Sequence, residues 1–451
     1  MAPLVIENCA VATVDHVGNE YADGHVVVDG PRITAVGPGP APVGPDVTRI
    51  DGRGCLVTPG LVNTHHHLYQ WATRGLAQSE NLFGWLRTLY PVWRRIDDAI
   101  VHDAAAAGLA WLAMSGCTTT TDHHYVFPRD GGDLFAAEVE AARRIGLRFH
   151  PSRGAMDRGH SSGGLPPDDV VETVEAALAA THDAIARYHD PSPESMLRVA
   201  VAPCSPFSVS SHLLTASAEL AREAGVRMHT HLAETLDEED FCQRTHGCGP
   251  VEYLDQLGWL GPDVWLAHGV HLSAEGIKLL AAAGTSVAHC PSSNGRLGAG
   301  IAPVRALLDA GVPVGLGVDG PASQECGLLV EELRQAVYNA RYLGGPTALN
   351  PREALALATI GGARCLGRET EIGSLEPGKL ADLVLWRLDG LGHAGIADPV
   401  AALVLGPPAP VRLGMVQGRA VVVDGELRTA DVESLTIALT AAAARLEGSV
   451  R

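Results

Sequence analysis

The first sign of chemistry in this sequence is an HxH pair formed by His65 and His67. Two residues apart on a strand, both side chains point to the same side, where neutral imidazoles can bind one metal ion. Much later in the chain, His231 and Asp319 add another nitrogen and an oxygen. These four residues predict a site for one divalent metal ion, which suits Zn²⁺ and tolerates Fe²⁺.

Two further residues could move protons beside such a metal ion, which lowers the pKa of a bound water toward about 7. Glu234 follows His231 by three residues and could take the proton from that water, then deliver it to a ring nitrogen and a departing amine. His268 could hydrogen-bond the hydroxide or the alkoxide that forms, and Asp319 could assist as a metal-bound base. We therefore expect Glu234, His268 and Asp319 to be catalytic.

All of these residues follow short apolar segments that have the character of strands. Eight such segments alternate with Ala- and Leu-rich helical stretches, which is the pattern of βαβ units, and eight units predict a TIM barrel. Reactive side chains in this fold lie at the C-terminal ends of the strands. The expected strands are 61–65, 117–122, 148–152, 197–202, 227–231, 264–268, 285–289 and 312–319.

The two ends of the chain resemble each other and differ from its middle. Short β-type runs at 3–6, 25–28 and 33–36 alternate with Gly and Pro turns, and the C-terminal part has the same character. We predict an α/β protein with three parts: residues 1–58 and 369–451 form the halves of one small β-sandwich domain, and 59–368 form the barrel. A last helix near 432–446 is expected to pack on the outside.

Composition limits the partners and the compartment. Of the 451 residues 46% are hydrophobic, and a formal net charge of −19 repels nucleic acid and anionic membranes. The nine Cys are odd in number and contain no CxxC pair, which favours reduced thiols. Neither a signal peptide nor an apolar run of about 20 residues is visible. We therefore expect a cytoplasmic protein with a small-molecule substrate.

Other catalytic designs lack their required residues. A two-metal barrel site bridged by a carboxylated lysine needs a Lys after the fourth strand, but the only lysines are Lys278 and Lys379. The other class of zinc deaminase needs PCxxC, whereas Cys204 and Cys290 stand in PCSPF and HCPSSN. A GxxxxGK[ST] motif is also absent.

Several further residues have two open interpretations. His66, His123 and His124 are expected to be core residues or supports for the metal ligands, and His289 either touches the site or packs nearby. Trp71, Trp85 and Trp93 either stack on a flat ring or simply pack the first loop. The acidic run 237–240 is expected to be a solvated loop or a helix start.

The segments PGLVNTHHH, HTHLAE, LAHGV, AHCPSSN and GVDG, in this order, resemble the amidohydrolase superfamily in its mononuclear deaminase and chlorohydrolase branch. The resemblance covers essentially the whole chain. It implies zinc held by His65, His67, His231 and Asp319, with Glu234 and His268 as acid/base partners. It also implies substrate contacts from Gln70, with Cys204 and Asn294 as alternatives to a turn-forming role; His289 and Trp85 complete the expected contacts. Relatives are commonly oligomeric, so a homo-oligomer is expected.

Finer segments, among them SSGGLPPDDVVE, APCSPFSVS and HCPSSNGRLGAGIAPVR, look like the 8-oxoguanine deaminases, with the s-triazine hydrolases next. The expected activity is hydrolysis of a C–N bond in a cyclic amidine. A metal-bound hydroxide would convert 8-oxoguanine to urate and ammonia. The alternatives are a triazine, pterin or pyrimidine aminohydrolase or chlorohydrolase, and a non-catalytic metal-binding scaffold. After Asp319 the chain has GPASQEC, where Pro321 and Gln324 could reshape the pocket.

Overall fold

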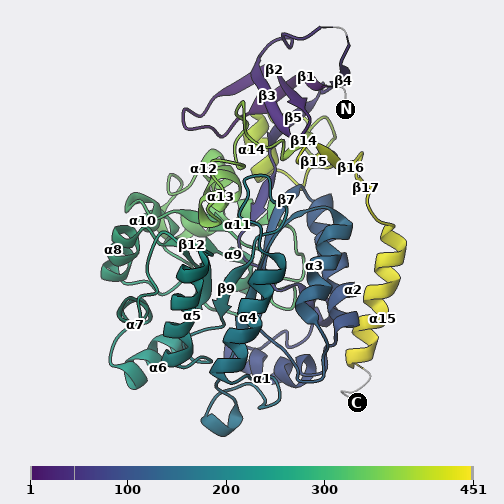
Figure 1. Cartoon of the computed structure of the whole chain (residues 1–451). Coiled ribbons are helices and arrows are strands. Elements are labelled where there is room, and N and C mark those ends of the chain that lie inside the picture. Colours follow the sequence, from purple (N-terminus) through teal and green to yellow (C-terminus); the bar gives the residue numbers. More distant parts are fainter. Residues whose placement is uncertain (1–2, 45, 448–451) are drawn as a thin grey trace.

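Eight parallel strands close into a barrel at the centre of the computed structural model, which describes residues 3–44 and 46–447 (Figure 1). Neighbouring strands pair in chain order, and the last pairs with the first through Leu316 and Asn63. The TIM-barrel prediction is confirmed. The strands are β6 (Leu61–Asn63), β7 (Cys117–His124), β8 (Arg148–Ala155), β9 (Ala200–Pro203), β10 (Met228–Leu232), β11 (Val264–His268), β12 (Ser286–His289) and β13 (Val314–Leu316).

Two of these strands end earlier than the sequence pattern predicts. β6 ends at Asn63 and β13 at Leu316, and their extensions meet again only at an isolated bridge between His66 and Asp319. The backbone leaves the regular ladder there because the side chains of His65, His67 and Asp319 must all turn toward one point.

Helices follow most of the strands and form the outer ring. Side-chain caps set their starts, as where Ser210 accepts the N–H of Leu213, and glycines with positive φ, such as Gly146 and Gly225, follow their last residues. The helices are η1 (Leu68–Thr73), α1 (Leu82–Trp93), α2 (Asp98–Met114), α3 (Leu134–Ile145), η2 (His160–Ser162), α4 (Val174–Tyr188), α5 (Ser211–Ala224), α6 (Leu236–His246), α7 (Pro250–Gln256), α8 (Ala274–Ala283), α9 (Pro291–Arg296), α10 (Val304–Asp309), α11 (Leu329–Gly344), α12 (Pro351–Ala356), η3 (Leu357–Gly361) and α13 (Gly362–Cys365).

A second sheet is built from both ends of the chain, as predicted. Its central pairing is antiparallel and joins β5 to β14, from Pro59 opposite Leu383 to Cys55 opposite Arg387. A core of aliphatic and Cys side chains from both chain ends fills this β-domain. Its strands are β1 (Leu4–Ala12), β2 (Glu20–Asp29), β3 (Arg32–Pro38), β4 (Thr48–Asp51), β5 (Cys55–Pro59), β14 (Leu383–Arg387), β15 (Val411–Val416), β16 (Arg419–Val423) and β17 (Glu426–Leu427), and α14 (Pro399–Leu405) accompanies them.

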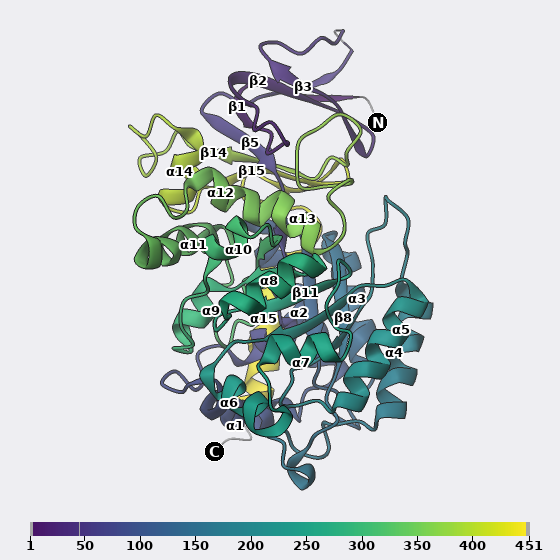
Figure 2. The ribbon, with the colours of Figure 1, turned by 90° about the vertical axis from the view of Figure 1, so that its left-hand side faces the viewer.

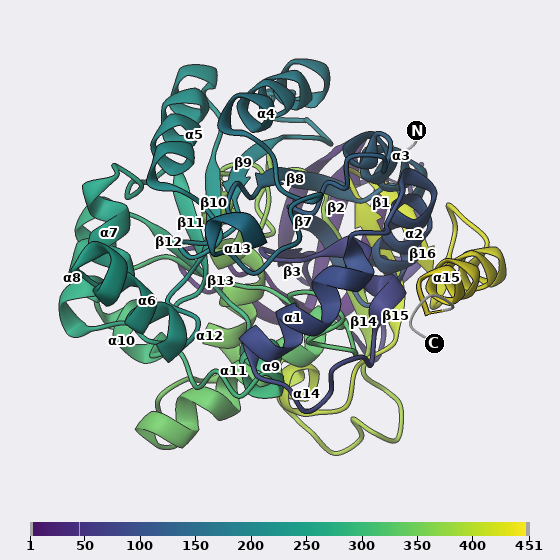
Figure 3. The ribbon, with the colours of Figure 1, turned by 90° about the horizontal axis from the view of Figure 1, so that it is seen from below.

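The β-domain lies beyond the N-terminal ends of the barrel strands (Figure 2). β5 runs into β6 through Gly60, so the chain enters the barrel from the β-domain side. We call the N-terminal end of the barrel the floor and the C-terminal end the mouth. Figure 3 looks at the mouth, with α1 lying across it.

The last helix, α15 (Val432–Glu447), packs against α2 on the outside of the barrel, as expected (Figure 1). It buries Leu435, Ala442 and Leu446. Among the described residues, no helix is both long enough and apolar enough to cross a bilayer.

The β-domain meets the barrel at Trp386 of β14. Its ring is buried, its Nε1–H donates to Thr58 Oγ1 at 2.8 Å, and its edge lies against Gly116 in the turn between α2 and β7. Gly116 has a φ of 88°, and a Cβ there would lie 2.0 Å from a ring carbon of Trp386. Both the backbone conformation and the close approach require glycine.

We predict that Gly116→Ala lowers the free energy of unfolding by about 3 kcal/mol or more, because the methyl group must displace a buried indole. Gly425→Ala is the matched control, since Gly425 has a φ of 78° but no neighbour within 4 Å of its Cβ position. Its cost is the backbone strain alone, about 1 kcal/mol. Calorimetric thermal unfolding measures both, and equal losses in the two variants would contradict this account of the junction.

Candidate active site

The four predicted metal ligands converge at the mouth. The Nε2 atoms of His65 and His67 each lie 3.3 Å from Asp319 Oδ1, and His67 Nε2 lies 3.2 Å from His231 Nε2. These residues come from the ends of β6, β10 and β13, so the closure of the barrel brings them together. His268 joins the cluster, within 4.8 Å of the ligand nitrogens of His65 and His231.

Backbone carbonyls fix the orientation of two imidazoles. His67 Nδ1 lies 2.7 Å from the carbonyl of His123, and His231 Nδ1 lies 2.6 Å from the carbonyl of Cys204. A carbonyl only accepts, so Nδ1 carries the proton in both rings and the Nε2 lone pair faces the cluster. This is the arrangement that a metal-binding histidine requires.

A second histidine does the same for His65. His229 donates from Nδ1 to the carbonyl of Trp265 at 2.7 Å, so its Nε2 accepts the Nδ1–H of His65 at 2.8 Å. His65 Nε2 is fully buried and has no hydrogen-bond partner among the described residues. Burial lowers the pKa of His65 well below its ordinary value and that of His231 to about 3, which keeps both rings neutral. An unpartnered buried lone pair beside two more imidazoles and a carboxylate fits a divalent metal ion.

Asp319 is held from several sides. Its Oδ2 accepts the hydroxyl of Ser293 at 2.6 Å, and its Oδ1 accepts the N–H of Gly320 at 2.7 Å. Burial alone would raise the pKa of this carboxyl, but the neighbouring imidazoles of His65 and His67 hold it well below its ordinary range. Asp319 also has a φ of 62°, a conformation uncommon for a residue other than glycine and often found where a side chain is aimed at a functional site.

Glu234 and His268 lie beside the ligands. His268 Nε2 is 3.6 Å from Glu234 Oε2 and 4.0 Å from Asp319 Oδ2. Its Nδ1 lies 3.0 Å from Asn294 Oδ1, which orients the ring. Glu234 is buried, and its burial together with the charge of Asp319 raises its pKa well above 4.5. Two groups able to exchange protons thus face the same space.

The acidic run 237–240 begins a helix, α6, but one of its members is not solvated. Glu238 is fully buried, and its carboxylate accepts the backbone N–H groups of Ala233 at 2.9 Å and Glu234 at 3.2 Å. It fixes the turn that aims Glu234 and forces Ala233 to a φ of 51°. Its spacing of four residues from Glu234 is the only sequence signal that could have indicated this support.

Two of the extra histidines support the ligands, as one of the two interpretations predicts. His66 Nδ1 lies 2.6 Å from the carbonyl of Asp319, and Trp71 donates to its Nε2 at 3.2 Å. His123 contributes its carbonyl to His67, and its own Nε2 lies 2.9 Å from the carbonyl of Ala202.

His124 belongs to a separate buried cluster behind the mouth. Its Nε2 donates to the carbonyl of Val126 at 2.8 Å, so its Nδ1 must accept, and Glu138 Oε1 lies 2.5 Å from it. This contact requires a protonated Glu138, and burial raises its pKa to about 8. Asp122, whose pKa is raised by burial and by Glu138, accepts the N–H of Leu68 at 2.6 Å, directly after the HxH pair.

Glu138→Gln should reduce the loss of stability at alkaline pH. The folded protein binds the Glu138 proton more tightly than the unfolded chain, so this group stabilises the fold below pH 4.5 and the contribution is lost as pH rises through about 8. A glutamine N–H can still donate to His124. Thermal midpoints at pH 5.5 and 8.5 test this: the wild-type difference should shrink in Glu138→Gln and persist in Glu140→Gln, an exposed neighbour. An unchanged difference would exclude the shared proton.

A small cavity opens beside the cluster, between the mouth and α1. Its open space is about 30 Å³, room for about two water molecules. Aromatic and aliphatic side chains form much of its wall. It is lined by His67, Leu82, Trp85, Leu86, Tyr90, Tyr125, Cys204, Ser205, Phe207, His231, Glu234, His268, Leu297, Asp319 and Ser323.

The five residues expected to contact a substrate divide into two groups. Cys204 and Trp85 line the cavity, whereas Gln70, Asn294 and His289 are not among its lining residues. Gln70 is buried with its amide against the backbone of Gly320, and neither of its polar atoms has a partner within the described part of the chain.

Most of the residues that were expected to shape the pocket or form its wall do not line the cavity. Gln324 is buried and donates to Glu332 at 2.7 Å, away from the cavity, and Pro321 does not line it either. Trp93 donates to Thr73 at 3.1 Å and Trp71 donates to His66, so both have the packing role that was one of the two interpretations. Only Trp85 faces the cavity, with its Nε1–H bonded to the carbonyl of Ala322 at 3.0 Å.

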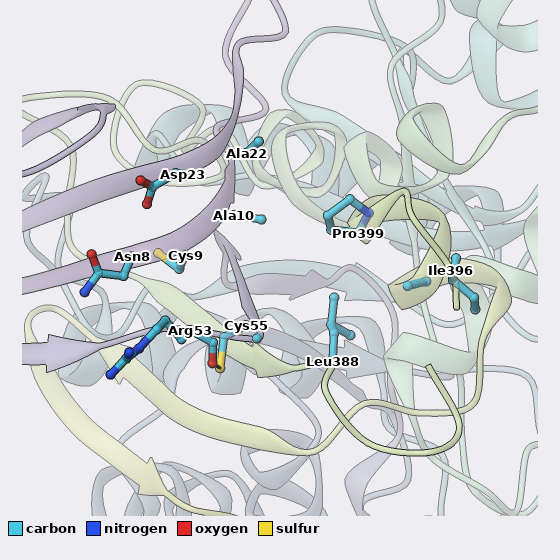
Figure 4. A pocket seen from close by; sticks show the side chains of 12 residues that line it. Asn8, Cys9, Ala10, Ala22, Asp23, Arg53, Cys55, Leu388, Ile396 and Pro399 are labelled. Carbon is cyan, nitrogen blue, oxygen red and sulfur yellow. Dashed lines mark hydrogen bonds between the residues drawn. The ribbon is translucent and has the colours of Figure 1, made fainter. Parts of the chain in front are cut away.

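A larger hollow of about 700 Å³ lies in the β-domain, beside Cys9 and Cys55 (Figure 4). Its side chains come from β1, β2, β5 and the segment around Pro399, and they do not converge on one point in the view. It is remote from the histidine cluster at the other end of the barrel, which remains the site able to do chemistry.

A closed (β/α)8 barrel with imidazoles and a carboxylate gathered at its mouth defines a class of metal-dependent barrel hydrolases. The amidohydrolase family model matches residues 56–421. This chain belongs to the amidohydrolase family.

Similar proteins lie on several branches of the family. The 8-oxoguanine deaminase of Pseudomonas aeruginosa is 47% identical over 95% of this chain and 96% of its own. An isoxanthopterin deaminase from an unknown prokaryotic organism is 38% identical over 93% and 92%. Among solved structures, the atrazine chlorohydrolase of Arthrobacter aurescens TC1 complexed with zinc has a TM-score of 0.91 at 35% identity, covering 98% of this chain and 100% of that chain.

His229→Ala should lower the affinity for a divalent metal ion by about 10- to 100-fold, because His65 loses the partner that orients its ring. Chelator competition followed by metal analysis measures this affinity. His212→Ala, on the exposed face of α5, is the control and should bind as the wild type does. Unaltered affinity in His229→Ala would show that His65 needs no such support.

Proposed function

We propose that this chain is a zinc-dependent aminohydrolase that converts 8-oxoguanine and water to urate and ammonia. The observation that carries the proposal is the unpartnered Nε2 of His65 beside Asp319, which lines the same cavity as Glu234. The 47% identity to an 8-oxoguanine deaminase supports the choice of substrate. His65, His67, His231 and Asp319 are the proposed ligands.

A bound zinc ion would lower the pKa of a water molecule, which becomes the nucleophile. Glu234 accepts the proton of that water and delivers it to a ring nitrogen, which makes the amino-bearing carbon more electrophilic. The C–O bond forms, Glu234 transfers the second proton of the water to the amino group, and the C–N bond breaks to release ammonia. His268, 3.6 Å from Glu234, stabilises the oxygen on which negative charge develops, with Asn294 holding its ring.

The walls of the cavity suit a flat heterocycle. Trp85, Tyr90, Tyr125 and Phe207 offer aromatic surfaces, and Cys204 and Ser205 offer polar atoms at the edge. The open space of about 30 Å³ is far smaller than a bicyclic ring. Substrate therefore enters only when α1, which contributes Leu82, Trp85, Leu86 and Tyr90, moves away from the mouth.

The identity of the metal, the location and the oligomeric state are further parts of this proposal. We propose one zinc ion per subunit, at a site that also tolerates Fe²⁺, a cytoplasmic location and a homo-oligomer. Gln70 and His289 do not line the cavity, so we propose that they act indirectly, through the residues that surround it. The boundaries after residues 58 and 368 are likewise proposed; the first falls one residue before the end of β5.

Glu234→Gln should bind zinc as the wild type does but lose at least about a hundredfold in kcat, because the amide cannot accept the proton. His65→Ala should lose the metal as well. Ammonia release from the zinc-loaded protein with 8-oxoguanine measures turnover, and Glu219→Gln, exposed on α5, is the matched control. Near-full turnover in Glu234→Gln would exclude its proposed role.

The same assay should be run with guanine, isocytosine, pterins and melamine-type triazines, and with chloride release from chlorotriazines. The highest kcat/KM is expected for 8-oxoguanine. Preference for a pterin or triazine would leave the proposed metal chemistry unchanged but would overturn 8-oxoguanine as the substrate. Zinc binding without turnover of any of these compounds would overturn the proposal that the protein is an enzyme.

A further inference from the structure

Four arginines gather at the floor of the barrel, at the end opposite to the mouth. Arg148 begins β8, Arg198 and Arg227 stand just before β9 and β10, and Arg368 follows α13. Arg148 and Arg368 are fully buried, and the side chain of Arg198 is 12% exposed. Four guanidinium groups in such a place must be balanced by negative charge.

Only part of that charge is supplied by carboxylates. Arg148 is paired with Asp382, its Nε and Nη2 lying 3.0 and 3.1 Å from the two carboxylate oxygens. Glu371 is shared, with Arg198 Nη2 and Arg368 Nε each at 2.6 Å. Two carboxylates thus serve three guanidinium groups.

Arg227 has no carboxylate at all. Its Nε–H donates to the carbonyl of Cys365 at 3.0 Å, and across residues 3–44 and 46–447 no carboxylate oxygen lies within the 4.0 Å of an ion pair. Arg227 therefore has no ion pair of its own, and the carboxylates of Glu369 and Asp263 act on its charge only from beyond that distance.

Shared partners place these groups next to one another. The carbonyl of Ser195 accepts from Arg148 Nη1 at 2.5 Å and from Arg368 Nη2 at 2.9 Å. Gly367 accepts from Arg198 at 3.5 Å, and the guanidinium of Arg227 lies against its Cα. We call this group, with His150, the floor cluster.

Polar atoms of the floor cluster remain buried without a partner in the described structure. They are Arg368 Nη1, Arg198 Nε, Arg227 Nη2 and His150 Nδ1. His150 is 1% exposed, and it follows Phe149, whose carbonyl accepts the backbone N–H of Arg198 at 3.2 Å. Burial and then the charges of Arg368, Arg198 and Arg227 lower the pKa of His150. Buried N–H groups are nearly always satisfied, so several unsatisfied donors in one cluster point to an acceptor beside them.

We propose that the floor cluster binds one small inorganic anion of the size of chloride, through the unpartnered nitrogens of Arg368, Arg198, Arg227 and His150. An anion accepts the free N–H groups and adds negative charge beside Arg227, which has no ion pair. A monatomic anion imposes no fixed arrangement on donors that come from separate side chains. The anion joins barrel strands to Glu371 and to Asp382, which directly precedes β14, so it strengthens the contact between barrel and β-domain.

The thermal midpoint of the zinc-loaded protein should rise with chloride from 0 to 300 mM, at an ionic strength held constant with gluconate. A hundredfold excess over the dissociation constant corresponds to about 3 °C for a chain of this length. Arg227→Met should lose the chloride dependence. Arg222→Met, an exposed arginine paired with Asp263, should keep it.

A midpoint indifferent to chloride in the wild type would overturn the proposal, since water alone would then fill the cluster. A rise with phosphate but not with chloride would overturn the monatomic anion. Crystals of the wild type grown in bromide give a test that needs no variant. An anomalous peak within hydrogen-bond distance of Arg368 Nη1 is expected, and its absence would also overturn the proposal.

Discussion

The site at the mouth depends on one kind of interaction, the hydrogen bond from an imidazole Nδ1–H to an acceptor on another part of the barrel. His67 and His231 use the carbonyls of His123 and Cys204, and His65 uses His229. Each bond fixes a tautomer and directs an Nε2 lone pair into the histidine cluster. The register of the barrel strands sets these acceptors, so the fold itself determines the ligand geometry.

The two ends of the barrel contain buried polar atoms of opposite kinds that have no partner in the described structure. At the mouth, a lone pair of His65 and the carboxylate of Asp319 gather where a cation fits. At the floor, unpartnered N–H groups of arginine side chains lie where we propose an anion. These arginines come from distant parts of a chain whose formal net charge is −19.

The sequence predicts the features that recur with each β/α unit of the barrel. Strand-end histidines and Asp319 could be located because each follows an apolar run, and the barrel and the two-ended β-domain follow from the same alternation. His229 forms a second HxH pair with His231, but its role as the hydrogen-bond partner of His65 depends on the orientation of its ring. Glu238 and Glu138 could not be assigned, because only packing decides that an acidic residue on a helix is buried. Whether Gln70, Asn294 or His289 reaches the cavity likewise depends on side-chain direction rather than on spacing.

The narrow space under α1 has a kinetic consequence. A resting chamber that holds about two water molecules cannot capture a ring by simple collision, so encounters succeed only during the fraction of time for which the helix is displaced. The second-order rate of association is then scaled down by that fraction, well below the diffusion limit. Selection among heterocycles begins at entry, before any bond is broken.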